Sequence, residues 1–260
     1  RRMGPSPTTR PQRERGDAAH NPSMTPVERT GTARALVAGL VKRLTVRLTA
    51  DGAPPRLIVG LTGAPGSGKS TLVERIGAEL AARELLAGCV PMDGFHMSGA
   101  VLAELGRRGR KGAPDTFDVA GYIATLDRVR GPDEFGLPAE VLAPVYRRDL
   151  HEPVAAGTRV TGSGVVLTEG NYLALESGGW EGVRTRIDLL VMIDVAQDEL
   201  IRRLIARHKS FGRSHVAAAH WVRAVDVPNA RLVAASADRC DELWRLEPDD
   251  DPAARPPSCA

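Results

Sequence analysis

"GLTGAPGSGKST", at residues 60–71, places three glycines within six positions and follows them with a lysine and two hydroxyl side chains. Residues 63–70 match the pattern G-x-x-x-x-G-K-[ST] at every fixed position. An apolar run typical of a buried strand precedes the glycines, and apolar residues at helical spacing follow them. A strand, a glycine loop and a helix in this order predict a loop whose backbone N–H groups surround phosphate oxygens.

Two side chains of this loop have specific expected roles. Lys69 is placed to reach the β- and γ-phosphates of a nucleotide, and the Ser70 hydroxyl to ligate Mg²⁺. A glycine-rich turn with an exposed lysine is the alternative, which the flanking strand and helix disfavour. The predicted nucleotide-binding residues are Gly63, Ala64, Pro65, Gly66, Ser67, Gly68, Lys69, Ser70 and Thr71.

Composition limits the partners that we expect. The net charge of +3 equals that of residues 1–30, which hold six arginines and three acidic residues, so the rest of the chain is neutral. A neutral domain gives no reason to predict nucleic-acid binding. No run of 18 apolar residues suggests a membrane span, and three scattered cysteines are typical of a reducing compartment. We therefore expect a cytoplasmic protein.

The pattern along the chain predicts one domain, which contains the phosphate-binding loop, at residues 25–248. Residues 1–24 and 249–260 are expected to be a disordered extension and a disordered tail, because both are rich in proline and lack periodic apolar positions. Thr25 and Pro26 are expected to cap a first helix, and a strand over 88–93 is expected to end at Asp93.

The remaining elements alternate. Strands are expected at 56–63, 140–146, 164–170, 187–195 and 242–247, and helices from about 69 and at 119–129, 197–210, 215–224 and 229–237. This alternation predicts a three-layer α/β/α fold with a mostly parallel sheet of about five strands. A helical lid is expected near residues 200–215.

Carboxylates that follow predicted strands are the candidates for catalysis and metal binding. Asp93 lies in "PMDGFHM", and in an open α/β sheet ligands bind at the carboxyl ends of the strands. Its carboxylate is suited to accept the proton of an attacking hydroxyl, although Asp93-Gly94 is also a common turn dipeptide. For Mg²⁺ we favour Glu169, which a glycine turn places at the sheet edge, and interpret Asp194 as a strand end or helix cap.

A phosphate-binding loop by itself does not separate kinases from other nucleotide-binding proteins. The chain contains no NKxD sequence, which disfavours a guanine-specific protein. An aspartate beside the loop favours a kinase, since a kinase needs a base for its acceptor. The alternative is a nucleotide-dependent switch that changes shape and binds a protein partner.

Six segments occur in the order seen in the phosphoribulokinase/uridine kinase family of P-loop kinases, which the chain resembles over about residues 56–247. They are "GAPGSGKST", "VPMDGFHM", "RRGRKGAPDTFD", "APVYRRDLHEP", "VVLTEGNYL" and "RRLIARH". The likeness is strongest to pantothenate kinase-like and sugar-transport-associated members. It implies ATP and Mg²⁺ as cofactors, Asp93 as a catalytic base that also approaches the metal, and Glu169 as a metal-binding carboxylate.

The resemblance also implies roles for residues around the transferred phosphoryl group. Arg203 and Arg207, four positions apart on one predicted helical face, resemble lid arginines that close over the phosphates. The predicted substrate-binding residues are His96, Lys111, Tyr146, Arg147 and Arg148. A solvated surface position or a local hydrogen bond is the alternative for each of these side chains.

The predicted activity is transfer of the γ-phosphoryl group of Mg-ATP to a hydroxyl of a small metabolite. The chain has Asp-Gly-Phe-His at 93–96 where uridine kinases carry Asp-Ser-Phe-Tyr, so nucleoside, pantothenate-like alcohol and sugar acceptors all stay open. We expect no nucleic-acid or membrane partner, and a homodimer is compatible with the sequence.

Overall fold

The computed structural model describes residues 25–248, and the predictions for 1–24 and 249–260 lie outside these residues. Its main feature is a six-stranded, fully parallel sheet in the order β1-β8-β7-β2-β6-β3. The strands are β1 (Val27–Thr32), β2 (Arg56–Gly63), β3 (Leu86–Cys89), β6 (Gly164–Glu169), β7 (Leu189–Asp194) and β8 (Glu242–Glu247). The α/β fold is confirmed, and the main sheet has six strands where about five were expected.

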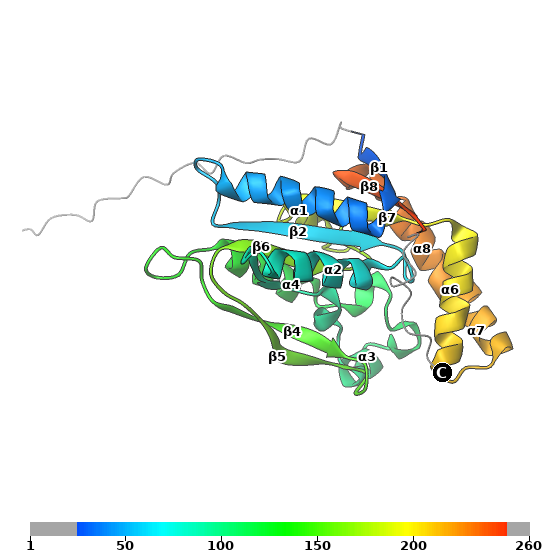
Figure 1. Ribbon diagram of the computed structural model, residues 1–260. Coiled ribbons are helices and arrows are strands. Elements are labelled where there is room, and N and C mark those ends of the chain that lie inside the picture. The colour runs from blue at the N-terminus through cyan, green and yellow to red at the C-terminus, as the bar shows by residue number, and fades with distance from the viewer. Residues whose placement is uncertain (1–24, 249–260) are drawn as a thin grey trace, which may run out of the picture.

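Helices cover both faces of this sheet (Figure 1). On one face α1 (Ala33–Thr49) and α2 (Lys69–Ala81) pack against alternate residues of β2, namely Leu57, Val59 and Leu61. On the other face Ile58 meets α4 (Val119–Arg130), α5 (Glu181–Arg184) and α8 (Val227–Ala234). Because β2 is buried on both sides, each of its apolar side chains contributes about 1.5–3 kcal/mol to folding.

The N-terminal prediction is wrong at Thr25-Pro26, which does not cap a helix. Residues 27–32 form β1 instead, paired in parallel with β8 at the edge of the sheet. The first helix begins after it, and Thr32 caps that helix by accepting a hydrogen bond from the backbone of Ala35 (3.2 Å). An edge strand in which no residue is buried lacks the apolar pattern that marks buried strands.

A second correction concerns residues 140–146, which were expected in the main sheet. They lie in β4 (Val141–Arg147), which forms a separate antiparallel hairpin with β5 (Glu152–Val160). Along β4 the buried Val141 and Ala143 flank the exposed Leu142, whereas β6 is almost fully buried. Alternation of this kind is typical of a strand with one solvated face.

The helical lid is formed by α6 (Gln197–Ser210) and α7 (His215–Trp221), which stand across the end of the sheet where β2 terminates (Figure 1). A π-helical turn, Val222–Asp226, joins α7 to α8. The helix predicted at 215–224 therefore ends earlier than expected, and the helix predicted at 229–237 begins earlier. The remaining elements are α3 (Gly99–Glu104) and the 3₁₀ turns Met92–Phe95, Arg108–Arg110, Pro114–Thr116 and Ala237–Arg239. Within residues 25–248, none of the helices has the length and apolar character needed to cross a bilayer.

Replacing Gly94 with alanine should destabilise the contact between the Met92–Phe95 turn and the hairpin. A Cβ atom at Gly94 would overlap the backbone carbonyl of Pro144 in β4, so the hairpin must move away. We expect a loss of about 1–3 kcal/mol in the free energy of unfolding, measured by urea denaturation. Gly109→Ala is the matched control, because no atom lies within 4 Å of its added Cβ. Equal stability of the two variants would contradict this packing.

Candidate active site

The P-loop is shaped by backbone conformations that favour glycine. Gly63, Gly66 and Gly68 have φ angles of 148°, 81° and 94°, and a Cβ at Gly63 would lie 2.8 Å from the carbonyl oxygen of Ile193. The helix α2 begins at Lys69, as expected, so its free N–H groups face the loop. The buried Ser67 Oγ finds no hydrogen-bond partner in the described part of the chain. A buried polar atom and a glycine cradle at a helix N-terminus fit a phosphate group.

Lys69 is held inside this loop. Its Nζ donates hydrogen bonds to the carbonyl oxygens of Gly63 (2.9 Å) and Ala64 (3.0 Å), and only 7% of the residue is exposed. Burial lowers the pKa of Lys69 to about 8, while the carboxylates of Glu169 and Asp93 act to raise it. The ammonium is therefore poised between charged and neutral forms near physiological pH.

Nucleotide affinity should consequently weaken in alkaline solution. Bound phosphates stabilise the charged lysine, so above the free-state pKa of about 8 binding must take up a proton. We expect the Kd for Mg-ATP to rise about tenfold per pH unit above pH 8, measured by calorimetry up to about pH 9.5. The Lys69→Arg variant, charged throughout, should bind with an affinity independent of pH. A wild-type affinity that is flat over this range would refute the role given to Lys69.

Glu169 ends β6 directly beside the P-loop. The Ser70 Oγ lies 3.4 Å from each of its carboxylate oxygens. Burial raises the pKa of Glu169, and the nearby charge of Asp93 raises it further. Asp194, the other candidate, accepts from Arg245 Nε at 3.0 Å and lies in an exposed ion pair. Of the two predicted carboxylates, the structure brings Glu169 next to Ser70.

A hydroxyl and a carboxylate at this position fit Mg²⁺, which prefers oxygen ligands. The described residues hold no group of three or more His, Cys, Asp or Glu side chains that could bind a metal by themselves. Such a preformed cage is not needed, because Mg²⁺ usually binds through one or two carboxylates together with substrate phosphates. Ser70 and Glu169 would hold the ion, with Asp93 facing the same space.

Asp93 does not end a strand, contrary to expectation. The strand β3 stops at Cys89, and Pro91, which has no N–H group for pairing, precedes the 3₁₀ turn Met92–Phe95 that contains Asp93. The Asp93 side chain is 43% exposed. Its charge acts on Glu169 and Lys69, so all three groups converge at the carboxyl ends of β2 and β6.

The lid helix rests on the P-loop through Leu204. A Cβ atom at Gly66 would lie 3.2 Å from the Leu204 side chain, which shows how closely α6 covers the loop. At about 100° per residue, Arg207 lies only about 20° around the helix from the buried Leu200, and Arg203 about 60°. The two predicted lid arginines are therefore not equivalent.

Their contacts differ accordingly. Arg203 Nε donates to Glu199 Oε1 (2.6 Å), one turn earlier on the same helix. The pKa of Arg207 is lowered by desolvation and by the neighbouring Arg148, while Asp93, Asp226 and Glu169 act in the opposite direction. Arg207 is also exposed, and its guanidinium lies 5.9 Å from the ring of Phe211 at the end of α6. The two arginines differ in that the charge of Arg207 acts on Asp93 and Glu169, whereas Arg203 forms a surface ion pair with Glu199.

Arg147 and Arg148, at the end of β4, also differ in their contacts. Arg147 donates to both carboxylate oxygens of Asp149, at 2.9 and 2.7 Å, in an exposed pair. Arg148 carries a charge that reaches Glu169 and Arg207. Both arginines are exposed, but the charge of Arg148, which follows β4, acts on the groups of the site, whereas Arg147 is engaged by Asp149.

Beyond Asp93, three of the predicted substrate-binding side chains meet. The His96 Nδ1 contacts the backbone oxygen of Asp93 (2.8 Å), and its ring lies 4.8 Å from that of Tyr146. Lys111 Nζ lies 5.3 Å above the Tyr146 ring and donates to the carbonyl of His151 (2.6 Å). Burial lowers the pKa of His96, opposed by the charge of Asp93, and favours its neutral form.

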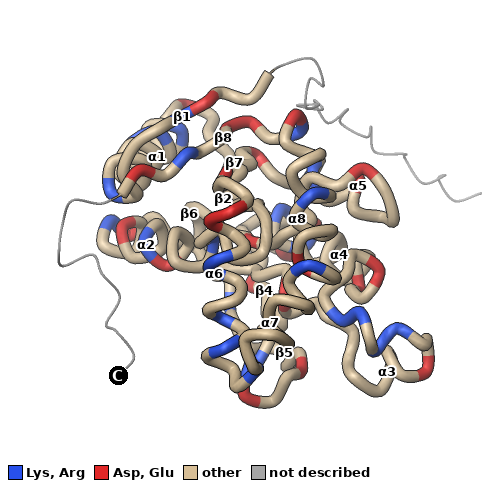
Figure 2. Tube along the Cα trace, turned by 90° about the vertical axis from the view of Figure 1, so that its right-hand side faces the viewer, with Lys and Arg blue, Asp and Glu red and all other residues tan. Residues whose placement is uncertain are grey.

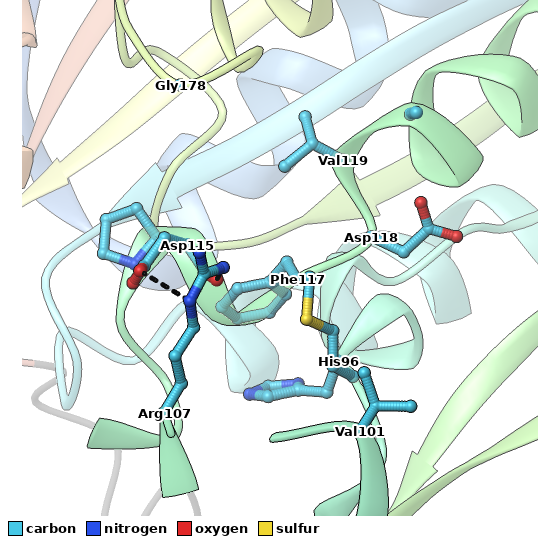
Figure 3. Close-up of a pocket in the computed structure, with 11 residues that line it drawn as sticks. His96, Val101, Arg107, Asp115, Phe117, Asp118, Val119 and Gly178 are labelled. Atoms are coloured by element: carbon cyan, nitrogen blue, oxygen red, sulfur yellow. Dashed lines mark hydrogen bonds and ion pairs between the residues drawn. The ribbon is translucent and has the colours of Figure 1, made fainter. Parts of the chain in front are cut away.

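A cleft of about 660 Å³ opens beside His96 and Phe117 (Figure 3). Val101 and Val119 give it apolar walls, and an ion pair between Arg107 and Asp115 closes one side. Its volume lies in the range of small-molecule sites. The sequence pointed to His96 but not to the cleft, because the turns and short helices between residues 96 and 120 must fold back on one another to form its walls, with Gly178 added from a distant loop.

Other residues of the site were missed by sequence reasoning. Glu152 accepts from the backbone of Gly99 (2.9 and 3.1 Å) and lies 4.0 Å from Lys111 Nζ, which ties the hairpin to α3. Asp226 contacts His208 on the lid helix. In the sequence, only the turn residues before Glu152 and the proline after Asp226 drew attention to these positions. Such residues predict a turn in the backbone, but they do not predict which side chains Glu152 and Asp226 contact.

The chain is similar to proteins of one known family. The model of the phosphoribulokinase/uridine kinase family matches residues 58–241. The chain is 33% identical over 184 residues to the uncharacterised protein YggC of Escherichia coli strain K12, covering 68% of this chain and 73% of that protein. It is 30% identical over 169 residues to a proposed uridine kinase of Schizosaccharomyces pombe, covering 59% and 66% respectively.

A crystal structure of another protein has a similar fold. The proposed fructose transport system kinase from Silicibacter sp. TM1040 superposes with a TM-score of 0.71 at 33% identity. The alignment covers 82% of this chain and 98% of that one. The fold and the order of its elements are therefore shared over most of the described residues.

Proposed function

Because the chain belongs to the phosphoribulokinase/uridine kinase family, we propose that it transfers the γ-phosphoryl group of Mg-ATP to a hydroxyl of a small metabolite. The observation that carries this proposal is the convergence of Lys69, Asp93, Glu169 and Arg207 at one edge of the sheet. Phosphoryl transfer depends chiefly on positioning and on charge stabilisation, which these groups supply.

Each residue has a distinct part in the proposed reaction. The Asp93 carboxylate accepts the proton of the acceptor hydroxyl, and its 43% exposure leaves it accessible to that group. Lys69, Arg207 and Arg148 stabilise negative charge on the transferring group from three directions. Bound to Ser70 and Glu169, Mg²⁺ would neutralise phosphate charge. Leu204 packs α6 against the P-loop, so this helix covers one side of the loop.

The cleft beside His96 is the proposed place for the body of the acceptor. His96 directs Nδ1 to the backbone oxygen of Asp93, so the neutral ring leaves Nε2 as a hydrogen-bond acceptor. Apolar walls and the Arg107–Asp115 pair favour an acceptor with both apolar and polar parts. Nucleosides, pantothenate-like alcohols and sugars all meet this description.

A coupled ADP-release screen across these three acceptor classes tests the proposal. We expect ADP release to rise well above the rate without acceptor for one class, and the product to carry the phosphoryl group by mass spectrometry. ATP turnover that no acceptor changes, combined with a nucleotide-dependent change in shape by small-angle scattering, would favour the switch. In that outcome the kinase assignment for this chain is abandoned.

A further inference from the structure

We propose that Asp226 and His208 form a latch that positions the lid arginine Arg207 over the phosphates. This inference rests on the proposed function, because it concerns the same site. The residues come from different elements: His208 and Arg207 are neighbours on α6, and Asp226 ends the π-helical turn Val222–Asp226. Neither Asp226 nor His208 touches the reacting groups, so both are positioning residues.

The latch is a direct contact in a shielded place. His208 Nε2 donates to Asp226 Oδ2 at 2.8 Å, and the two side chains are only 18% and 13% exposed. Two aromatic contacts enclose it: the His208 ring lies 6.5 Å from that of Trp221, and the Arg213 guanidinium lies 4.2 Å from the Trp221 ring. A hydrogen bond to a charged group in such surroundings is stronger than one in water.

The π-helical turn accounts for the position of Asp226. Pro228, in the first turn of α8, has no N–H group to donate to the carbonyl four residues earlier, and its ring crowds that carbonyl. The helix widens just before it, and Val227 donates to the carbonyl of Val222, five residues back. Single π-turns of this kind are frequent at functional sites. Here the turn brings the Asp226 carboxylate to face α6.

Charge explains why Arg207 needs support. The positive charge of Arg148 acts on Arg207, and like charges repel. The carboxylate of Asp226 attracts Arg207 and Arg213, so it offsets part of this repulsion. Figure 2 shows Lys and Arg positions along α6 on the side of the molecule that faces the viewer. Without the latch, α6 is still seated by Leu204 and still packs against α7, but the end that carries Arg207 loses its side-chain hydrogen bond to the turn before α8.

A double-mutant cycle tests the latch. Asp226→Asn and His208→Gln are made in the wild-type and in an Arg207→Ala background, and kcat, the KM for acceptor and the Kd for Mg-ATP are measured. In the wild-type background we expect kcat to fall about tenfold and KM for the acceptor to stay within about twofold. In the Arg207→Ala background neither substitution should lower kcat further. Asp226→Glu should recover part of the loss.

Matched controls separate the latch from general stability. Asp238→Asn and His220→Gln alter exposed residues of the same C-terminal region and should leave kcat unchanged. Equal losses of kcat in both backgrounds would show that Asp226 does not act through Arg207, and an unchanged kcat in the wild-type background would also overturn the latch. If no acceptor supports transfer, the proposed function fails, but the Kd for Mg-ATP still tests whether the latch acts through Arg207. That Kd should then rise about fivefold on Asp226→Asn, and only when Arg207 is present.

Discussion

Asp93→Asn should lower kcat for phosphoryl transfer by about 10²–10⁴-fold, because an amide cannot accept the proton of the acceptor hydroxyl. Asparagine keeps the size of the side chain and the 3₁₀ turn that carries it. The Kd for Mg-ATP should stay within about threefold of the wild-type value, since the P-loop and Lys69 are untouched. Stopped-flow measurement of ADP formation at saturating acceptor, beside calorimetry for ATP, separates the two quantities.

Asp194→Asn is the control for this variant. Asp194 also ends a strand of the sheet, but it accepts from Arg245 in an exposed ion pair and lies apart from Ser70. Its substitution should leave kcat nearly unchanged. An Asp93→Asn variant with wild-type transfer to a responsive acceptor would remove Asp93 from the role of base. A large loss of activity on Asp194→Asn would reopen the choice of metal-binding carboxylate.

The fold could be predicted from sequence where a segment is buried on both sides. Strands β2, β6 and β7 have continuous apolar runs, and α6 begins and ends at the predicted residues. β1 was not predicted as a strand, and β4 was predicted as a strand but assigned to the main sheet and not to a separate hairpin. The partner of an edge strand is decided by contacts with distant residues such as those of β8, which local periodicity does not report.

The site was predictable in its residue types and less so in its geometry. The P-loop motif carries its own mechanism, so its residues lie where expected once the strand and helix are in place. Arg203 and Arg207 share a helical face in sequence, and only the packing of Leu200 and Leu204 distinguishes them. The cleft beside His96 and the contact of Asp226 with His208 depend on tertiary placement. Sequence spacing holds no information on such pairs.

Arg207→Ala should lower kcat by about 10²–10³-fold, which is the range seen when an enzyme loses one group that stabilises charge in the transition state. Arg207 extends from a helix that is seated on the P-loop, and its charge acts on Asp93 and Glu169. The Kd for Mg-ATP should rise much less than kcat falls, because charge on the transferring oxygens is greatest during transfer. Single-turnover measurements with saturating enzyme report this step directly.

Arg203→Ala provides the matched comparison on the same helix. Its guanidinium pairs with Glu199 and is 44% exposed, so its loss should change kcat by no more than about twofold. The β4–β5 hairpin offers a second pair of this kind, because the charge of Arg148 acts on Glu169 whereas Arg147 pairs with Asp149. Equal losses from Arg203→Ala and Arg207→Ala would mean that the lid moves as it closes and brings both arginines to the phosphates. A much larger loss of kcat from Arg207→Ala than from Arg203→Ala would mean that α6, as it lies in this structure, already places the arginine that stabilises the transferring phosphoryl group.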